Sequence, residues 1–555
     1  MSSPPFGDMT CSVTWFAIPM RLLNGKFKKF ITGYYQDTAG SSQFLKRPNM
    51  MFDFTQYSDA NGSLMASYYS VNNYRRYNLF DYLGIRFTLD EGIFPINEYI
   101  ECARVLAFWY VYFEYFVDQN LGYRPYLRFA SLANPNGYKF RLRLEDGTIS
   151  QVDSIMNWEQ FTQLVLREST KYPAIGGYLT IGDCIEHGLD IKIYDIDPLV
   201  LEFLICVPEK CWPKDYFTSA LPWAQKGNPV TVPVTSAQDV EFDVEFPRGS
   251  RSLLMDSVTQ QPIGGGDVVT RNGGFIYSQP EGGTIGNSAY VATNGAKASG
   301  TIDQLSFTIN DLRSSYALQS WLEKNARCGS RYVEQILSHF GVRSSDARLQ
   351  RPEYLGGFRL PVHVSSVAQT SEDGATPQGN LAGNAVAAGV GKTITYFCEE
   401  HMLIIGLMYV QPKPYYFQGL SRLLTRREFY DFYFPEFQHL GEQEIHNYEI
   451  YNGNNVSRKD TFGYQSRYSE YKFMNNGLYG DFLHNSLRSW LFGVREFGES
   501  PTLSPEFLQV SPSREQSLLA PWPVTKDDSF DKLYCQIDIQ VNSLRPIDKY
   551  GTPYL

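Results

Sequence analysis

One segment of the chain has the residue types of a phosphate-binding loop. Residues 387–393 read AAGVGKT, and their last three residues match the end of the motif G-x-x-x-x-G-K-[ST]. The motif also needs a glycine at position 386, where this chain has Val386. No buried strand is predicted before the segment, although the motif requires one. The sequence therefore does not predict nucleotide binding.

The histidine and cysteine residues form no recognisable catalytic or metal-binding pattern. Cys398 and His401 flank two glutamates, but a zinc site needs a second ligand pair at suitable spacing. The eight cysteines include no C-x-x-C, and Cys206 and Cys211 are the only close pair. We therefore predict no enzymatic activity, metal or cofactor, and we expect the cysteines to be buried free thiols.

Two basic clusters interleave with aromatic residues. Single-stranded nucleic acid binds such surfaces because cations attract its phosphates and rings stack on its bases. A solvated face, or a face that bridges subunits, has the same composition and remains an alternative. The basic residues are Arg21, Lys26, Lys28 and Lys29 in the first cluster, and Arg422, Arg426 and Arg427, followed by Phe429 and Tyr430, in the second.

The composition indicates a folded protein that forms interfaces. At 555 residues the chain exceeds a usual domain of roughly 100–200 residues, so it holds several domains or one core with large insertions. Aromatic residues make up 15% of the chain and are enriched in protein interfaces. The net charge of −10 confines any DNA contact to local patches. The first residues lack a signal-peptide pattern, so we expect synthesis in a reducing cytoplasm.

Short apolar runs broken by Gly, Pro, Asn and Asp predict a mainly β protein. One strand with a buried face is expected near the C-terminus, where apolar residues alternate with polar ones. Helical periodicity appears over residues 97–117 and 331–340, and Asn310 or Asp311 is a plausible N-cap for a third helix. Helices therefore decorate a β framework, which argues against a doubly wound sheet. The alternating apolar positions of the C-terminal strand are Leu533, Cys535, Ile537, Ile539 and Val541.

A glycine-rich stretch divides the chain. Residues 264–300 contain ten of the 45 glycines, a composition that favours loops and turns. Short β-branched and aromatic runs with Asn-Gly turns lie within it, so we expect hairpins. We interpret residues 230–300 as an insertion that stands off a body formed by residues 1–229 and 301–555. A second insertion is possible over residues 122–208.

Several blocks of sequence closely resemble the major capsid proteins of gokushovirus-like microviruses. The longest is RYVEQILSHFGVRSSDARLQRPEYLGG at residues 331–357. Others follow in the family's order, among them YFTSALPWAQKGNPVTVPV, FYDFYFPEFQHLGEQEI and FGYQSRYSEYKF. Together the blocks extend over residues 14–555, which makes the resemblance far more specific than the short motifs above.

The resemblance implies a structural protein of the virion. The expected fold is an eight-stranded antiparallel jelly roll with long insertion loops and a few helices. Identical subunits, with pentamers as intermediates, are expected to close into a T=1 icosahedral shell around circular single-stranded DNA, assembled in the bacterial cytoplasm. The implied partners are other copies of the chain, the packaged DNA, a scaffolding protein, a small basic DNA-binding protein, a pilot protein and a host receptor.

By the same resemblance, the 230–300 insertion is expected to project from the shell, to meet its symmetry mates at the threefold axis and to bind the host. Its apolar residues are too few for an independent core, so neighbouring copies are expected to shield them. These residues are Val268, Val269, Phe275, Ile276, Tyr277, Tyr290 and Val291.

Two features depart from the family pattern. Few residues precede the block at residues 15–30, so either the given sequence starts late or this lineage builds the preceding strand differently. The stretch 122–208 is longer than its counterpart, which favours a divergent microvirus. The alternative function is a jelly-roll protein that binds glycans or receptors at a surface, and an enzyme ranks third because no convergent site is visible. Particles of capsid size, as opposed to a small oligomer, would distinguish the first two.

Overall fold

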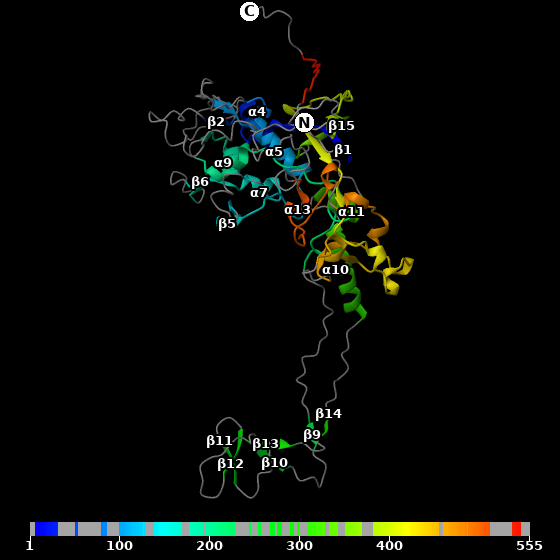
Figure 1. The fold of residues 1–555 in the computed structure, drawn as a ribbon. Coiled ribbons are helices and arrows are strands. Elements are labelled where there is room, and N and C mark those ends of the chain that lie inside the picture. The colour runs from blue at the N-terminus through cyan, green and yellow to red at the C-terminus, as the bar shows by residue number, and fades with distance from the viewer. Residues whose placement is uncertain are drawn as a thin grey trace, which may run out of the picture. The chain divides into compact units, whose positions relative to one another are not determined.

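Figure 1 shows the computed structural model of the chain. The structure describes residues 6–31, 50–53, 79–85, 99–125, 127, 138–168, 177–192, 196–227, 243–245, 253–256, 267–271, 275–279, 289–292, 297–299, 309–327, 332–341, 350–368, 381–453, 459–484, 487–510 and 535–545.

The chain divides into two compact units. The first, called here the body, comprises Met1–Lys226 and Glu323–Leu555, and the second, called the inserted unit, comprises Gly227–Leu322. The inserted unit overlaps the predicted 230–300 insertion and extends further toward the C-terminus, where it takes in most of one helix. Projection of this unit from a shell stays a prediction.

Helices and short strands alternate along the first part of the body. In chain order they are β1 (Met9–Pro19), α1 (Met20–Leu23), α2 (Phe27–Ile31), β2 (Met51–Asp53), α4 (Leu79–Tyr82), β3 (Tyr99–Glu101), α5 (Ala103–Tyr115), β4 (Phe140–Arg143), β5 (Ile149–Val152), α7 (Trp158–Thr162), β6 (Val165–Glu168), β7 (Tyr178–Thr180), α8 (Ile181–His187), β8 (Ile191–Lys192) and α9 (Pro198–Ile205).

The second part of the body begins with a helix and continues with longer strands. Its elements are α11 (Tyr332–Phe340), β15 (Glu353–Ala368), β16 (Leu381–Val386), β17 (Met402–Pro412), β18 (Tyr415–Tyr416), η3 (Arg422–Leu424), η4 (Phe429–Asp431), η5 (Pro435–Phe437), β19 (Glu442–His446), α12 (Asn447–Ile450), β20 (Thr461–Ser466), η6 (Ser469–Tyr471), β21 (Asn476–Gly477), η7 (Gly480–Phe482), η8 (Arg488–Trp490) and α13 (Pro505–Leu508), where η marks a 3₁₀ turn.

The largest sheet among the described residues has four antiparallel strands in the order β16-β15-β1-β17. Strand β1 lies between strands from the other end of the chain, with Val13 opposite Phe358 of β15 and Met408 of β17. Side chains alternate between the faces of a strand, so every second residue of β1 lies on one face. The body is therefore sheet-rich with helices, as the sequence predicts, and the eight-stranded jelly roll stays a prediction.

One face of this sheet packs against helix α5. Phe16 and Ile18 of β1 are buried beside Ile405 and Leu407 of β17, and the ring centroid of Phe16 lies 4.8 Å from that of Tyr115. Nine of the thirteen residues of α5 are buried, so the helix is apolar on almost every side. Such a helix belongs in the middle of a core, and α5 lies there.

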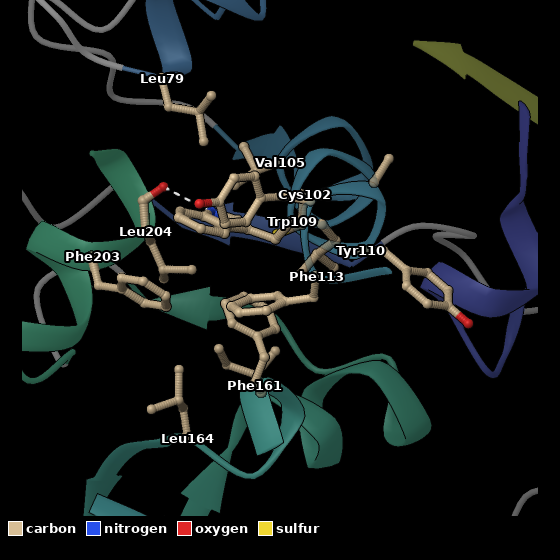
Figure 2. Close-up of a cluster of buried hydrophobic side chains, with 14 of the residues drawn as sticks. Leu79, Cys102, Val105, Trp109, Tyr110, Phe113, Phe161, Leu164, Phe203 and Leu204 are labelled. Atoms are coloured by element: carbon tan, nitrogen blue, oxygen red, sulfur yellow. Dashed lines mark hydrogen bonds between the residues drawn. The ribbon is translucent and has the colours of Figure 1, made fainter. Parts of the chain in front are cut away.

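The main core is built around Trp109 of α5. Figure 2 shows its indole among Phe113, Phe161 and Phe203. The ring centroids of Trp109 and Phe203 are 4.6 Å apart, and the indole N–H donates to the carbonyl of Leu204 at 3.2 Å. A fully buried tryptophan needs such an acceptor, because an unpaired polar group in the core is costly.

Residues 122–208 supply much of this core. Phe140 and Phe161 are fully buried, and Arg143 makes two hydrogen bonds of 2.9 and 2.8 Å to the carboxylate of Asp183. The same carboxylate accepts from the backbone and hydroxyl of Thr180, which completes a capping box at the start of α8. These residues are integral to the body; an insertion relative to other capsid proteins stays a prediction.

A second core of the body surrounds a buried arginine. The guanidinium of Arg495 lies 4.0 Å from the ring centroid of Phe507 and within 5.6 Å of the rings of Trp212, Tyr416 and Phe497. It donates to the hydroxyl of Tyr416 at 3.1 Å and to the carbonyl of Phe507 at 2.6 Å. Ring faces and oxygen dipoles thus surround its charge.

Among the described residues of the inserted unit there are three two-stranded antiparallel ladders, whose strands are labelled in Figure 1. The predicted hairpin is confirmed for β11 with β12, but β13 pairs with β10 and β14 with β9, so no hairpin joins β13 to β14. The elements are β9 (Asp243–Glu245), β10 (Leu253–Asp256), β11 (Asp267–Arg271), β12 (Phe275–Gln279), β13 (Ala289–Ala292), β14 (Lys297–Ser299) and most of α10 (Ile309–Arg327).

The helix predictions hold better than the C-terminal strand prediction. Helix α11 is confirmed, and the helix predicted over 97–117 is the shorter α5. The N-cap prediction is wrong, because Asn310 and Asp311 lie inside α10. The strand prediction is also wrong for residues 535–541, which form no strand. Ile537 and Ile539 are more than half exposed, since alternation predicts a strand only where a partner edge is available.

No helix among the described residues combines the length and apolar character that a membrane crossing requires.

Candidate assembly surface and nucleic-acid contacts

Residues 421–440 form a chain of 3₁₀ turns, η3, η4 and η5. The carboxylate of Asp431 accepts the backbone N–H groups of Arg427 and Glu428 at 2.8 and 3.0 Å, which fixes the start of η4. Partial burial opposes ionisation of Asp431, but these two donors lower its pKa. Pro435 begins η5 with a φ angle already suited to a turn. The sequence thus holds this segment in a defined conformation.

The turns present their apolar side chains outward. Tyr430 packs on Phe437 with ring centroids 4.9 Å apart, and Tyr433 packs on Tyr468 at 5.2 Å and on Tyr471 at 6.3 Å. We call the following exposed residues the aromatic surface: Leu424, Phe429, Tyr430, Phe432, Tyr433, Phe434, Leu440 and Tyr471.

Arginines on this surface stack on rings. The guanidinium of Arg426 lies 5.1 Å from the ring centroid of Phe432 and 5.8 Å from that of Tyr471, and it donates to the hydroxyl of Tyr471 at 2.7 Å. Arg467 lies over Tyr468 and donates to the backbone carbonyl of Tyr430. These contacts link the segment of turns to residues 467–471.

A buried ion pair anchors the turns to the second core. Nη1 of Arg422 lies 3.5 Å from Oε1 of Glu449, and both side chains are largely buried. Glu449 also accepts from the hydroxyl of Tyr216 at 2.9 Å and from the backbone N–H of His446 at 3.0 Å. Burial raises the pKa of Glu449, and the N–H of His446 and the charge of Arg422 partly offset that rise.

The second basic cluster therefore divides by role. Arg422 is occupied by Glu449 and by the carbonyl of Glu444, and Arg426 by its stacking contacts. Arg427 is exposed to solvent. The sequence analysis placed these arginines beside Phe429 and Tyr430 but missed the rest of the aromatic surface. The sequence does contain a signal for this surface, because residues 429–437 have six aromatic residues in nine positions.

The first basic cluster lies after strand β1. Arg21 donates from Nε to Oε2 of Glu400 at 2.8 Å and is mostly buried. Lys26 is half-buried, whereas Lys28 and Lys29 on α2 are exposed. The ring of Phe27 lies 5.4 Å from that of His401. This cluster sits on different elements of the body from the second one.

The apolar residues predicted for the protrusion lie on two ladders of the inserted unit. Val269 is opposite Tyr277 and Thr270 opposite Ile276 in the β11–β12 hairpin, which also holds Val268 and Phe275. The β10–β13 ladder carries the two others, Tyr290 and Val291.

The glycines of the phosphate-loop-like segment have a packing role. A Cβ atom on Gly389 would lie 2.5 Å from Cδ2 of Leu360, and one on Gly391 would lie 2.4 Å from Cε1 of Phe358. Glycine therefore lets this segment approach β15 closely. Cys398 and His401 are exposed, and no group of three or more His, Cys, Asp or Glu residues in the described ranges is arranged to hold a metal ion.

The described cysteines are all free thiols. Cys102 and Cys184 are buried, as predicted, and burial raises the pKa of each. Cys11, Cys206 and Cys211 are half-buried. The prediction is wrong for Cys398 and Cys535, which are exposed. Cys328 lies outside the described residues.

Comparison with known families gives the class of protein to which this sheet-rich body with its exposed aromatic surface belongs. The model of the family described as Capsid protein (F protein) matches residues 203–555. The chain belongs to this family. Its members are structural proteins of virions, which confirms the prediction that the chain is not an enzyme.

The individual relatives that the chain resembles are also capsid proteins. The chain is 36% identical to the capsid protein VP1 of Bdellovibrio phage phiMH2K, 35% to that of Chlamydia phage 1 and 33% to that of Spiroplasma virus 4. Each match covers 61% of this chain and 63–64% of the relative, so the chain spans just under two thirds of the length of these relatives. The resemblance to microvirus capsid proteins is confirmed.

Proposed function

We propose that the chain is the shell-forming subunit of a T=1 icosahedral microvirus capsid that encloses circular single-stranded DNA. The observation that carries the proposal is the family match over residues 203–555. The four-stranded antiparallel sheet supports an eight-stranded jelly roll, because it has the strand pairing of one layer of such a sandwich. The aromatic surface supports self-association, with pentamers as intermediates.

DNA contact is proposed for part of the two basic clusters. Lys28, Lys29 and Arg427 are exposed and suited to phosphate, whereas the side chains of Arg21 and Arg422 are largely buried. The net charge of −10 favours a separate small basic protein as the source of most counter-charge for the genome. A scaffolding protein and a pilot protein are the other proposed partners.

Host attachment is proposed for the inserted unit. Its short two-stranded ladders need neighbouring copies for stability, which fits a trimeric contact at the threefold axis. Deletion of residues 264–300 is expected to leave assembly intact and to abolish adsorption to host cells. Loss of particles in this variant would contradict the assignment.

The test of the shell proposal is expression of the chain with the other structural genes of its phage. Negative-stain electron microscopy and sedimentation should show closed icosahedral particles that protect single-stranded DNA from nuclease. A small oligomer that binds glycans and never closes would instead support the alternative, a surface-binding jelly-roll protein.

A further inference from the structure

We propose that the aromatic surface is the site where a second copy of this chain docks. The inference rests on the proposed shell function and deepens it by naming residues. The eight side chains are between 45% and 80% exposed in the single chain.

The size of the surface fits a subunit interface. With about 150–250 Å² for each large apolar side chain, the exposed parts of these eight residues amount to roughly 700–1,100 Å². The largest apolar patch on an ordinary monomer is about 300–600 Å². A standard interface buries about 800 Å² on each partner. The aromatic surface therefore exceeds what a lone subunit normally exposes and matches what a partner would cover.

The charge of the surface favours protein over DNA. Residues 421–440 contain three arginines, three carboxylates and no lysine, so the segment is nearly neutral. A nucleic-acid site needs a net positive footprint, because phosphate neutralisation supplies most of its affinity. Tyr, Phe and Arg are enriched and Lys is depleted in the centres of protein interfaces, which is the composition found here.

The surface is also held in place before binding. Asp431 fixes η4, the hydroxyl of Tyr468 donates to the carbonyl of Phe432 at 2.8 Å, and Arg426 stacks between two rings. Rings that are already ordered lose little conformational entropy on association. The three arginines of residues 421–440 come before the three carboxylates along the segment, so identical copies that meet in antiparallel orientation can present opposite charges to each other.

The decisive variants change side chains that the fold does not need. Phe429 and Leu424 are the most exposed members of the surface, so the double variant Leu424→Ser with Phe429→Ser should fold normally. Phe397→Ser is the matched control, because Phe397 is equally exposed and lies outside the surface. Sedimentation over a range of concentrations should show at least about tenfold weaker self-association for the double variant. If the double variant self-associates over the same concentration range as the wild type, the proposal is overturned.

Hydroxyl-radical footprinting of the wild-type chain separates the possible occupants. Tyr430 and Tyr433 should be several-fold less reactive in empty particles than in dissociated subunits. Protection that appears only in particles filled with DNA would overturn the proposal in favour of nucleic acid, and protection only when another phage protein is added would overturn it in favour of that protein. If the wild type forms no particles, the shell proposal fails, and the sedimentation comparison still decides whether a second copy docks here.

Discussion

Removal of the Glu449 carboxylate should destabilise the 3₁₀ turns that carry the aromatic surface. The variant Glu449→Ala leaves the largely buried guanidinium of Arg422 without its counter-ion, the hydroxyl of Tyr216 without its acceptor and the N–H of His446 uncapped. Breaking a buried ion pair from one side costs about 3–5 kcal/mol. We expect the lower end, about 3 kcal/mol, because Arg422 retains some solvent contact and a bond to a backbone carbonyl.

Hydrogen exchange measured by mass spectrometry tests the predicted loss of stability near the ion pair. A local measurement is needed because a chain with two units need not unfold in one step. A cost of about 3 kcal/mol corresponds to roughly hundredfold faster exchange in peptides that cover residues 420–426 and 442–450. Peptides from α5, which belongs to the other core, serve as the internal control. Acceleration of less than about fivefold, or about 1 kcal/mol, would refute the role of the ion pair as an anchor.

Three further predictions concern the body. Arg495→Lys should destabilise the second core by about 2–3 kcal/mol in urea unfolding, because lysine lacks the flat guanidinium that stacks on four rings; an unchanged midpoint would contradict this. Gly357→Ala should abolish or strongly reduce soluble expression, since its Cβ would lie 2.4 Å from the backbone oxygen of Val13, whereas Gly498→Ala, with open space around it, should behave as wild type. Asp431 has a lowered pKa in the folded chain. Its contribution to the stability of the turns is therefore present at pH values above about 3.9, the pKa of the unfolded chain, and is lost as pH falls through the folded pKa. Below about pH 4 the turns at 424–440 should therefore lose exchange protection, after correction for intrinsic rates, and Asp431→Asn should show the loss at every pH.

Local signals in the sequence predicted local structure well. Helix α11 has apolar residues on one side, and its observed start lies one residue from the predicted start. Helix α5 was harder to delimit, because a helix buried on nearly all sides has little periodicity to mark its ends. The alternation at residues 535–541 shows the limit of this reasoning: a strand also needs an edge to pair with, and the sequence pattern carries no information about that edge.

The candidate site was predictable only in part, for a similar reason. The basic cluster was visible, but the partners that engage it are distant in sequence, Glu449 for Arg422 and Tyr471 for Arg426. Composition therefore predicted seven equivalent cations where the structure has ion-paired, stacked and exposed ones. The run of rings at residues 429–437 was also visible. Its meaning depended on whether the rings face a core or solvent, and only the fold decides that.

The position of β1 in its sheet has a consequence for synthesis of the protein. Thr10 on β1 donates to the carbonyl of Gln411, which is 401 positions later in the chain. At about 5–20 residues per second, a ribosome needs roughly 20–80 s to produce that partner. Until β15 is made, the nascent chain carries an early apolar strand with both edges open, and the edge that pairs with β17 stays open for the whole interval as a template for pairing with other chains. High-level production in an infected cell thus depends on protection of the first twenty residues until translation is nearly complete.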